Sequence, residues 1–399
     1  KKKISSIICI VLTLLAVLPT QTETTRAQDS TEEFYGYLIE INPKQTYSMQ
    51  TNISILVNKL LQNNLSVYIL KKDTEIKTQK ISIKNEIENL DKNFNRGSYV
   101  VPFQDNLKTN KKIVLNTILY SISLNINSYK IKETLENIEV IRLNKPKIAI
   151  YETEGIDSRS YEHILNKGGF LNLENIGPEK LIKGFNAENF NLIAMGGKYG
   201  DFTDIFYESA SSQGRKVSKK IREFVENGGA FIGSCYGAYR SALGMKRPIG
   251  YPLFIANSML LNLIPTQIKI IDSYVYRALP GRGQISIKIT DKENPMTYGL
   301  PEILTNHTYG AGPVFLEKNF LKSNTKTIAN IKSINRNIWN WDAEMELCPW
   351  WNNGFSSDDA KNKKAERWIE KSINQPIWVY EEYGQGRSIA FGGHPEFAS

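Results

Sequence analysis

The chain has 399 residues, of which 41% are hydrophobic and 23% charged, and its formal net charge at pH 7 is +9. This length allows two domains with sizeable cores, and the ordinary composition excludes a disordered or fibrous protein. The lysines and arginines form no dense stripe, so no nucleic-acid partner is expected.

The chain opens with the basic, apolar and polar succession that is typical of a secretory signal peptide. Three lysines precede an apolar run over residues 4–18, and a small-residue cleavage site follows at residues 25–27. We therefore predict a signal peptide over residues 1–27 and a secreted or extracytoplasmic mature protein. An uncleaved membrane anchor is the alternative, although the run is shorter than the roughly 20 residues that span a bilayer. No integral membrane segment is expected in the mature chain.

Residues 28–143 are predicted to form a smaller N-terminal α/β module. Residues 34–41, 66–70 and 97–103 are rich in β-branched and aromatic side chains and predict strands. Residues 53–64 carry apolar side chains at helical spacing and predict a helix. The module contains no residues at catalytic spacing, so its role is not assigned.

A second domain is predicted over residues 144–399, where strand and helix patterns alternate from the start. This alternation predicts an α/β fold, with a flavodoxin-like parallel sheet and helices on both faces. The expected strands cover residues 147–151, 169–173, 191–195, 230–233 and 387–391. The expected helices cover residues 158–168, a segment that starts near residue 178, and residues 213–227.

One cysteine lies at the turn between an expected buried strand and an expected helix. Residues 233–237, Gly-Ser-Cys-Tyr-Gly, have the spacing of a nucleophile elbow with cysteine in place of serine. Ligands gather at the carboxyl ends of parallel strands, and a helix N-terminus favours a thiolate. Cys235 is therefore the candidate nucleophile. Two alternatives stay open, an inert buried thiol and a disulfide with Cys348.

The C-terminal segment supplies a candidate base and its orienting group. His394 and Glu396 flank Pro395 directly after an expected strand, so both side chains can face the same side of an extended chain. Glu396 could hold one ring nitrogen of His394 while the other faces a thiol. A capped surface turn is the alternative.

A glycine pair after the expected strand at 191–195 completes the predicted site. The backbone N–H groups of Gly197 and Tyr236 are the candidate oxyanion hole, and a plain strand-to-loop turn is the alternative for the glycines. The candidate residues of a substrate cleft are Gly196, Tyr239, His307 and Tyr309. A structural role in a turn is the alternative for His307. No metal site and no cofactor are expected.

All six tryptophans follow residue 338, and most fall in an insertion predicted at about residues 333–374. They could form an aromatic platform for a sugar or peptide. A small local core for the insertion is the favoured interpretation, because buried aromatic side chains dominate such cores. Cys348 lies in the same insertion, so its distance from Cys235 decides the disulfide question.

Five short motifs resemble the class I glutamine amidotransferase-like superfamily, and most of all the branch named for the N-terminal domain of biotin-protein ligases. They are "YETEG" at 151–155, "AMGG" at 194–197, "GGAFIGSCYGAY" at 228–239, "YGAGPVF" at 309–315 and "GRSIAFGGHPEF" at 386–397. The resemblance spans about residues 146–399. It implies Cys235 as nucleophile, His394 as base and Glu396 as orienting group. It also implies an oxyanion hole formed by Gly197 and Tyr236.

Together the motifs predict a cysteine hydrolase, a thiol amidohydrolase or peptidase, that cleaves an amide or peptide C–N bond. Glutamine-hydrolysing members carry His-Gln where this chain has Ala238-Tyr239, which argues against classical glutaminase activity. Biotin-ligase activity is not expected either, because no ligase catalytic domain is recognised. The alternative is a non-catalytic extracellular protein that keeps the fold and binds a peptide or glycan. The substrate and the oligomeric state are not assigned.

Overall fold

The computed structural model describes residues 35–42, 45, 47–80, 88–106, 126–134, 136, 138–198, 211–246, 260–269, 282–310, 312–315, 324–338 and 370–397. The predicted signal peptide, most of the tryptophan-rich insertion and Cys348 lie outside the described residues. Within these ranges, no helix is both long and apolar enough to cross a membrane.

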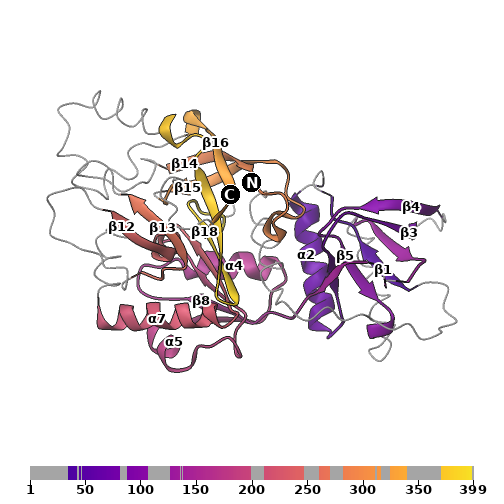
Figure 1. The fold of residues 1–399 in the computed structure, drawn as a ribbon, viewed down its shortest axis with the longest axis horizontal. Coiled ribbons are helices and arrows are strands. Elements are labelled where there is room, and N and C mark those ends of the chain that lie inside the picture. The colour runs from indigo at the N-terminus through magenta and orange to yellow at the C-terminus, as the bar shows by residue number, and fades with distance from the viewer. Residues whose placement is uncertain are drawn as a thin grey trace.

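The N-terminal part of the chain forms a seven-stranded antiparallel sheet with helix α2 (Tyr47–Gln62) against one face (Figure 1). In chain order the strands are β1 (Gly36–Ile39), β2 (Tyr68–Leu70), β3 (Thr74–Lys80), β4 (Glu88–Phe94), β5 (Tyr99–Pro102), β6 (Ser128–Ile131) and β7 (Val140–Arg142). Their order across the sheet is β4-β3-β6-β1-β5-β2-β7. The strands and helix expected from the sequence correspond to β1, β2, β5 and α2. Strands β3, β4, β6 and β7 are additional to that expectation.

The rest of the chain is organised around a nine-stranded mixed sheet in the order β15-β14-β16-β17-β18-β11-β10-β8-β9. Its strands are β8 (Ile148–Tyr151), β9 (Leu173–Ile176), β10 (Leu192–Met195), β11 (Ala230–Ser234), β14 (Arg282–Ile289), β15 (Ile303–Gly310), β16 (Lys326–Ile334), β17 (Pro376–Tyr383) and β18 (Gly386–Phe391). The parallel strands β9-β8-β10-β11-β18 follow the chain order 2-1-3-4-5, which is the flavodoxin-like order. The predicted α/β fold class is thereby confirmed. Strands β17, β16, β14 and β15 extend this sheet in antiparallel pairing and were not anticipated.

Helices cover both faces of the parallel strands (Figure 1). They are α4 (Ser158–Lys167), α5 (Pro178–Gly184), α7 (Ser212–Glu226) and α8 (Tyr236–Ser241). Local signals fix where the first three begin: Asp157 caps α4, Pro178 starts α5, and the Ser211 hydroxyl accepts from the Gly214 N–H at the start of α7. Alternate residues of β8 face opposite sides, so Ile148 and Ile150 pack with α4 while their neighbours pack with α5 and α7.

Among the described residues, a few short elements lie outside the two sheets. They are the strand pair β12 (Ala242–Lys246) and β13 (Ile264–Lys269), and the 3-10 turns η1 (Gln104–Asn106), η3 (Pro295–Thr297) and η5 (Arg336–Ile338). The strand expected at 169–173 begins later, as β9 at Leu173. The physical reason is the end of α4, where Gly169 adopts a positive φ of 84° and the Phe170 N–H returns to the Leu165 carbonyl. This turn occupies the residues that the sequence pattern assigned to the strand.

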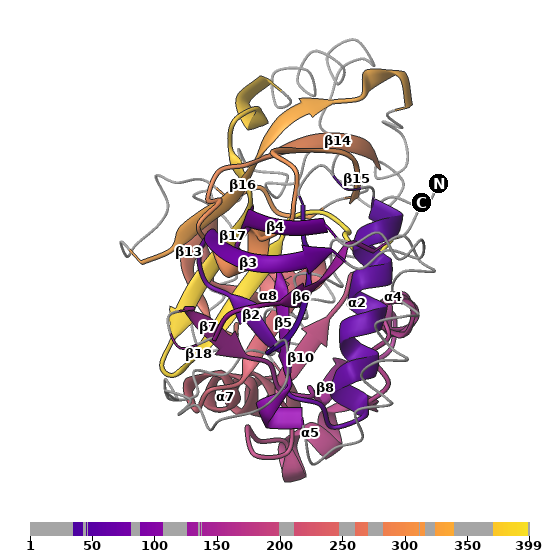
Figure 2. The same ribbon diagram turned by 90° about the vertical axis from the view of Figure 1, so that its right-hand side faces the viewer.

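Helix α2 joins the two sheets into one packed structure. It lies beside α4 in both views (Figures 1 and 2), and one hydrophobic cluster contains side chains from both sheets. The Asn58 Nδ2 donates to the Gly168 carbonyl at 2.8 Å, and the Gln62 Nε2 donates to the Gly169 carbonyl at 2.7 Å. The side chains of α2 thus satisfy backbone carbonyls at the C-terminal end of α4.

Replacing Asn58 with alanine should therefore destabilise the second sheet as well as the first. The substitution removes one of the two buried donors of the Gly168 carbonyl and leaves the Ser54 hydroxyl at 3.1 Å, so the loss of one hydrogen bond should cost about 0.5–1.5 kcal/mol. Because all six tryptophans follow residue 338, their fluorescence during urea unfolding reports on the second part of the chain. Asn58→Ala should lower the midpoint of that transition, whereas Lys59→Ala, on the exposed side of α2, should leave it unchanged. An unchanged midpoint in Asn58→Ala would mean that the sheets unfold independently.

Candidate active site

The turn from β11 into α8 holds Cys235 in an unusual backbone conformation. Its φ is 48° and its ψ is −102°, and residues other than glycine rarely adopt this combination. The flanking glycines make the turn possible. A Cβ at Gly233 would lie 2.5 Å from the backbone of Gly237, and one at Gly237 would lie 2.2 Å from the Met195 carbonyl oxygen. The strained, sterically closed turn is the geometry expected of a nucleophile elbow.

The Cys235 side chain is a free thiol, 8% exposed, at the carboxyl end of β11. Cys348, the partner in the alternative of a disulfide, lies outside the described residues. The Cys235 N–H donates to the Phe391 carbonyl of β18 at 3.0 Å, so the turn stays attached to the neighbouring strand. The Sγ lies 3.6 Å from the carbonyl oxygen of Gly310, which ends β15.

His394 and Glu396 follow β18 and lie in the same buried region, 7% and 2% exposed. The imidazole Nδ1 is 2.9 Å from Glu396 Oε1, and Nε2 is 3.0 Å from the Gly310 carbonyl oxygen. The His394 N–H donates to the Thr308 carbonyl at 2.8 Å, which fixes the backbone of this segment on β15. Phe397 stacks on the imidazole with ring centroids 4.4 Å apart. The side chain of His394 is thus held on both of its nitrogens and on one ring face.

These contacts favour the protonated form of His394. A carboxylate and a carbonyl oxygen only accept, so both ring nitrogens are placed to donate, as only the imidazolium can. Burial by itself lowers the pKa of His394, but the charges of Cys235 and Glu396 and the hydrogen bonds to both outweigh it. The pKa of His394 is consequently raised well above its usual range. The Gly310 carbonyl oxygen is 3.6 Å from Cys235 Sγ and 3.0 Å from His394 Nε2, so the two predicted reactive groups lie together.

Gly197 lies between the predicted nucleophile and the predicted base. A Cβ at this position would lie 2.6 Å from His394 Cε1 and 3.6 Å from Cys235 Cβ. The Gly197 carbonyl accepts from the Asp157 N–H at 2.9 Å, which connects the loop after β10 to the N-cap of α4. The roles of the Gly197 and Tyr236 N–H groups as an oxyanion hole stay a prediction.

The four residues expected in a substrate cleft are all buried. Tyr239 lies within α8, and the Tyr309 hydroxyl donates to the Gly312 carbonyl at 2.5 Å. A Cβ at Gly196 would lie 2.6 Å from the Asp157 carbonyl oxygen, so this glycine serves close backbone packing. The cleft itself stays a prediction.

His307, the fourth of these residues, lies beneath the site with no exposed surface. Its ring makes an edge-to-face contact with Trp378 at 5.6 Å, and neither of its nitrogens has a hydrogen-bond partner among the described residues. Burial, together with the charge of His394, lowers the pKa of His307 to about 3. The two histidines therefore have opposite tendencies: His307 stays neutral while His394 favours the charged form.

Gly310 and Phe397 contact the site but were not singled out from the sequence. Both belong to quoted motifs, "YGAGPVF" and "GRSIAFGGHPEF", so the signal for them was their position within those motifs. The interaction of Gly310 runs through its backbone carbonyl, which no side-chain pattern reveals.

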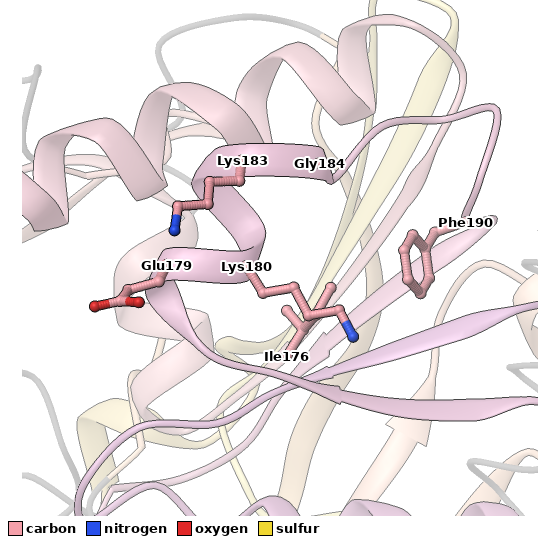
Figure 3. A pocket seen from close by; sticks show the side chains of 6 residues that line it. All are labelled: Ile176, Glu179, Lys180, Lys183, Gly184 and Phe190. Atoms are coloured by element: carbon pink, nitrogen blue, oxygen red, sulfur yellow. The ribbon is translucent and has the colours of Figure 1, made fainter.

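A surface pocket of about 400 Å³ lies away from this site, at the β9 edge of the sheet (Figure 3). Lys180 crosses Ile176 toward Phe190, whereas Glu179 and Lys183 extend away from it (Figure 3). Lys180 also pairs with Glu174 at 2.7 Å. Because β9 is three strands from β11, this pocket does not belong to the Cys235 site.

Residues 175–348 match the family described as biotin-protein ligase, N terminal. The predicted family resemblance is confirmed. The biotin-protein ligase-like segment contains Gly197, Cys235 and Gly310 and ends before His394 and Glu396. The match supports an amidotransferase-like α/β fold, the coarse part of the prediction.

None of the curated proteins matches this sequence. Among solved structures, a ThuA-like protein from Bacteroides uniformis is 13% identical, with 63% of this chain and 84% of that chain covered and a TM-score of 0.35. A protein from Thermoplasma acidophilum that is assigned to GMP synthase is 14% identical, with 63% and 85% covered and a TM-score of 0.34. A β-galactosidase from Bacillus circulans sp. alkalophilus is 12% identical, with 64% and 30% covered and a TM-score of 0.33. Similarities of this size do not bear on function.

Gly197→Ala should disrupt the site while leaving the fold intact. The new Cβ would overlap the imidazole of His394, which Glu396 and Gly310 hold in place, so the ring must move away from Cys235. We expect the ¹⁵N-histidine NMR signals of His394 to shift and the far-ultraviolet circular dichroism to stay unchanged. Gly184→Ala is the matched control, because a Cβ there meets nothing within 4 Å. Unchanged His394 signals in Gly197→Ala would contradict the close packing of this glycine.

Acidification should destabilise the protein through His307. Its folded pKa of about 3 lies below the reference value of 6.5, so the unfolded chain binds a proton that the folded chain does not. Stability should fall as the pH drops from about 6 to about 4, by up to about 1.4 kcal/mol per pH unit. Urea unfolding of wild type and His307→Phe across this range isolates the effect. His163→Phe, at an exposed site on α4, should keep the wild-type slope, and an equal slope in His307→Phe would refute the assignment.

Proposed function

We propose that this protein is a secreted cysteine hydrolase that cleaves an amide or peptide C–N bond. In this proposal Cys235 is the nucleophile, His394 transfers protons and Glu396 orients His394. The N-terminal sequence, with its basic, apolar and polar succession, supports export. The observation that carries the proposal is the meeting of the elbow cysteine with a histidine that is bound to a buried carboxylate.

The electrostatics of the site suit this chemistry. The imidazolium of His394 lies next to Cys235, and a neighbouring cation stabilises the thiolate that is the reactive form of a cysteine. Glu396 is buried and accepts from Nδ1, so it fixes the orientation of the ring and supports its positive charge. The same division of roles defines nucleophile, base and orienting group in hydrolases of unrelated folds.

The proposed reaction needs only water as a co-substrate. The thiolate attacks the carbonyl carbon, and the C–N bond breaks as His394 gives its proton to the leaving amine, which leaves a thioester on Cys235. His394, now neutral, takes a proton from water, and the resulting hydroxide attacks the thioester. The acid leaves, and the thiolate and the imidazolium are restored.

A second candidate function is supported by the contacts of Gly310. Its carbonyl oxygen lies 3.6 Å from Cys235 Sγ and accepts from His394 Nε2, so a substrate carbonyl can reach the thiol only if this segment moves. That arrangement suits a non-catalytic protein that keeps the fold and binds a peptide or glycan elsewhere. The hydrolase requires Gly310 to be displaced when substrate binds.

An acylation experiment separates the two functions. In a Cys9→Ser/Cys348→Ser background, Cys235 is the only thiol of the chain. The activated acyl donor p-nitrophenyl acetate should then form a thioester on Cys235, visible by intact-mass spectrometry and removed by hydroxylamine. His394→Ala should slow acylation at pH 7 by about 100-fold, in the range of general acid–base effects.

His163→Ala is the matched control, because His163 is an exposed histidine outside the site and should react as the parent does. Glu396→Gln should slow acylation by a smaller factor than His394→Ala, since it removes only the orienting charge. Equal acylation rates in the parent and in His394→Ala would contradict the hydrolase and leave the binding function.

A further inference from the structure

The edge strand β15 contains a β-bulge in its pairing with β14. One residue of β14, Ser286, lies opposite two residues of β15, Thr305 and Asn306. Asn306 is exposed and adopts a positive φ of 62°. The other neighbour of β14, strand β16, also has one extra residue at this level, Lys332. Both neighbours of β14 therefore bend at the same point of the sheet.

The bulge decides which side chains of β15 face the protein interior. In a regular strand alternate residues face the same side, so Asn306 would point inward with Leu304. Instead Thr305 and Asn306 are both exposed. The inward side resumes with His307 and Tyr309, which are 0% and 1% exposed. The extra residue thus exchanges the two sides of β15 from His307 onward.

The residues that follow the bulge hold His394 in place. The Thr308 carbonyl accepts from the His394 N–H at 2.8 Å, and the Gly310 carbonyl oxygen lies 3.0 Å from the imidazole Nε2. The turn before the histidine packs on the same strand, since a Cβ at Gly393 would lie 2.3 Å from His307 Nε2. Carbonyls two residues apart leave a strand on the same side, so a shift of β15 by one residue would remove both acceptors.

We propose that Asn306 is a positioning residue: its left-handed backbone holds the β-bulge, and the bulge sets the two carbonyls that bind His394. Asparagine is one of the few residues besides glycine that adopt a positive φ, whereas a β-branched residue at such a φ is a strong outlier. The inference rests on the proposed function for its catalytic meaning, but the placement of His394 can be tested without any substrate.

The first test is the Nε2–H signal of His394 in protein labelled with ¹⁵N-histidine, assigned by its loss in His394→Gln. Asn306→Val should shift this signal and speed its exchange with solvent, because a displaced β15 no longer offers the Gly310 carbonyl. Asn306→Gly should retain the wild-type signal, since glycine adopts the same φ without strain. Asn306→Ala replaces the valine variant if that variant does not fold, because alanine also disfavours a positive φ.

Asn64→Val is the matched control for the general cost of valine at a positive φ. Asn64 is exposed, has a φ of 58° and lies just after α2. Its replacement should lower Tm, as Asn306→Val does, but leave the His394 signal unchanged. An unchanged His394 signal in Asn306→Val, or in Asn306→Ala where only that variant folds, overturns the proposal. A shift of equal size in Asn64→Val overturns it as well.

Acylation of Cys235 by p-nitrophenyl acetate links the inference to the proposed function and keeps the two failures distinct. Asn306→Val should slow acylation about fivefold when His394 is present, as expected for the loss of one hydrogen bond. It should have no effect in the His394→Ala background, and equal slowing in both backgrounds overturns the positioning role. If wild-type acylation does not depend on His394, the hydrolase fails, and the NMR signal still decides the role of Asn306.

Discussion

The left-handed backbone at Cys235 is the constraint on which the rest of the site depends. The turn between β11 and α8 is so tight that neither flanking glycine has room for a Cβ. The cysteine N–H stays bonded to β18 through the Phe391 carbonyl, and the chain then continues three residues to His394. One pair of hydrogen-bonded parallel strands therefore delivers both the thiol and the imidazole to the same edge of the sheet.

The two buried histidines of this region differ in protonation because their surroundings differ. His394 has acceptors on both nitrogens and a neighbouring cysteine, and these raise its pKa despite burial. His307 has no such partner among the described residues, so burial keeps it neutral. The edge strand β15 serves both histidines. It carries His307 in its middle, and at its end the Gly310 carbonyl meets the Nε2 of His394.

Much of the fold was predictable because the local sequence patterns indicate the same helices and strands that tertiary packing stabilises. The helices show apolar residues at helical spacing with recognisable caps, and the parallel strands of the second sheet are short buried runs. Strands β3 and β4 escaped prediction because they are mostly polar, with Ile76 and Phe94 as their fully buried apolar side chains. The antiparallel extension of the second sheet was also missed. Pairing between strands that are distant in sequence leaves no periodicity of its own.

The sequence by itself determined the chemistry that is local in the chain. Glycines on both sides of Cys235 require a closed turn, and two-residue spacing allows Glu396 to reach His394. Only the tertiary structure decided what surrounds these groups: a free thiol, a buried His307 and a carbonyl that contacts both reactive side chains. Gly310 is 75 residues from Cys235 and 84 from His394 along the chain. Contacts over such separations form only when the folded sheet places its edge strand β15 beside the site. No local sequence pattern predicts that arrangement.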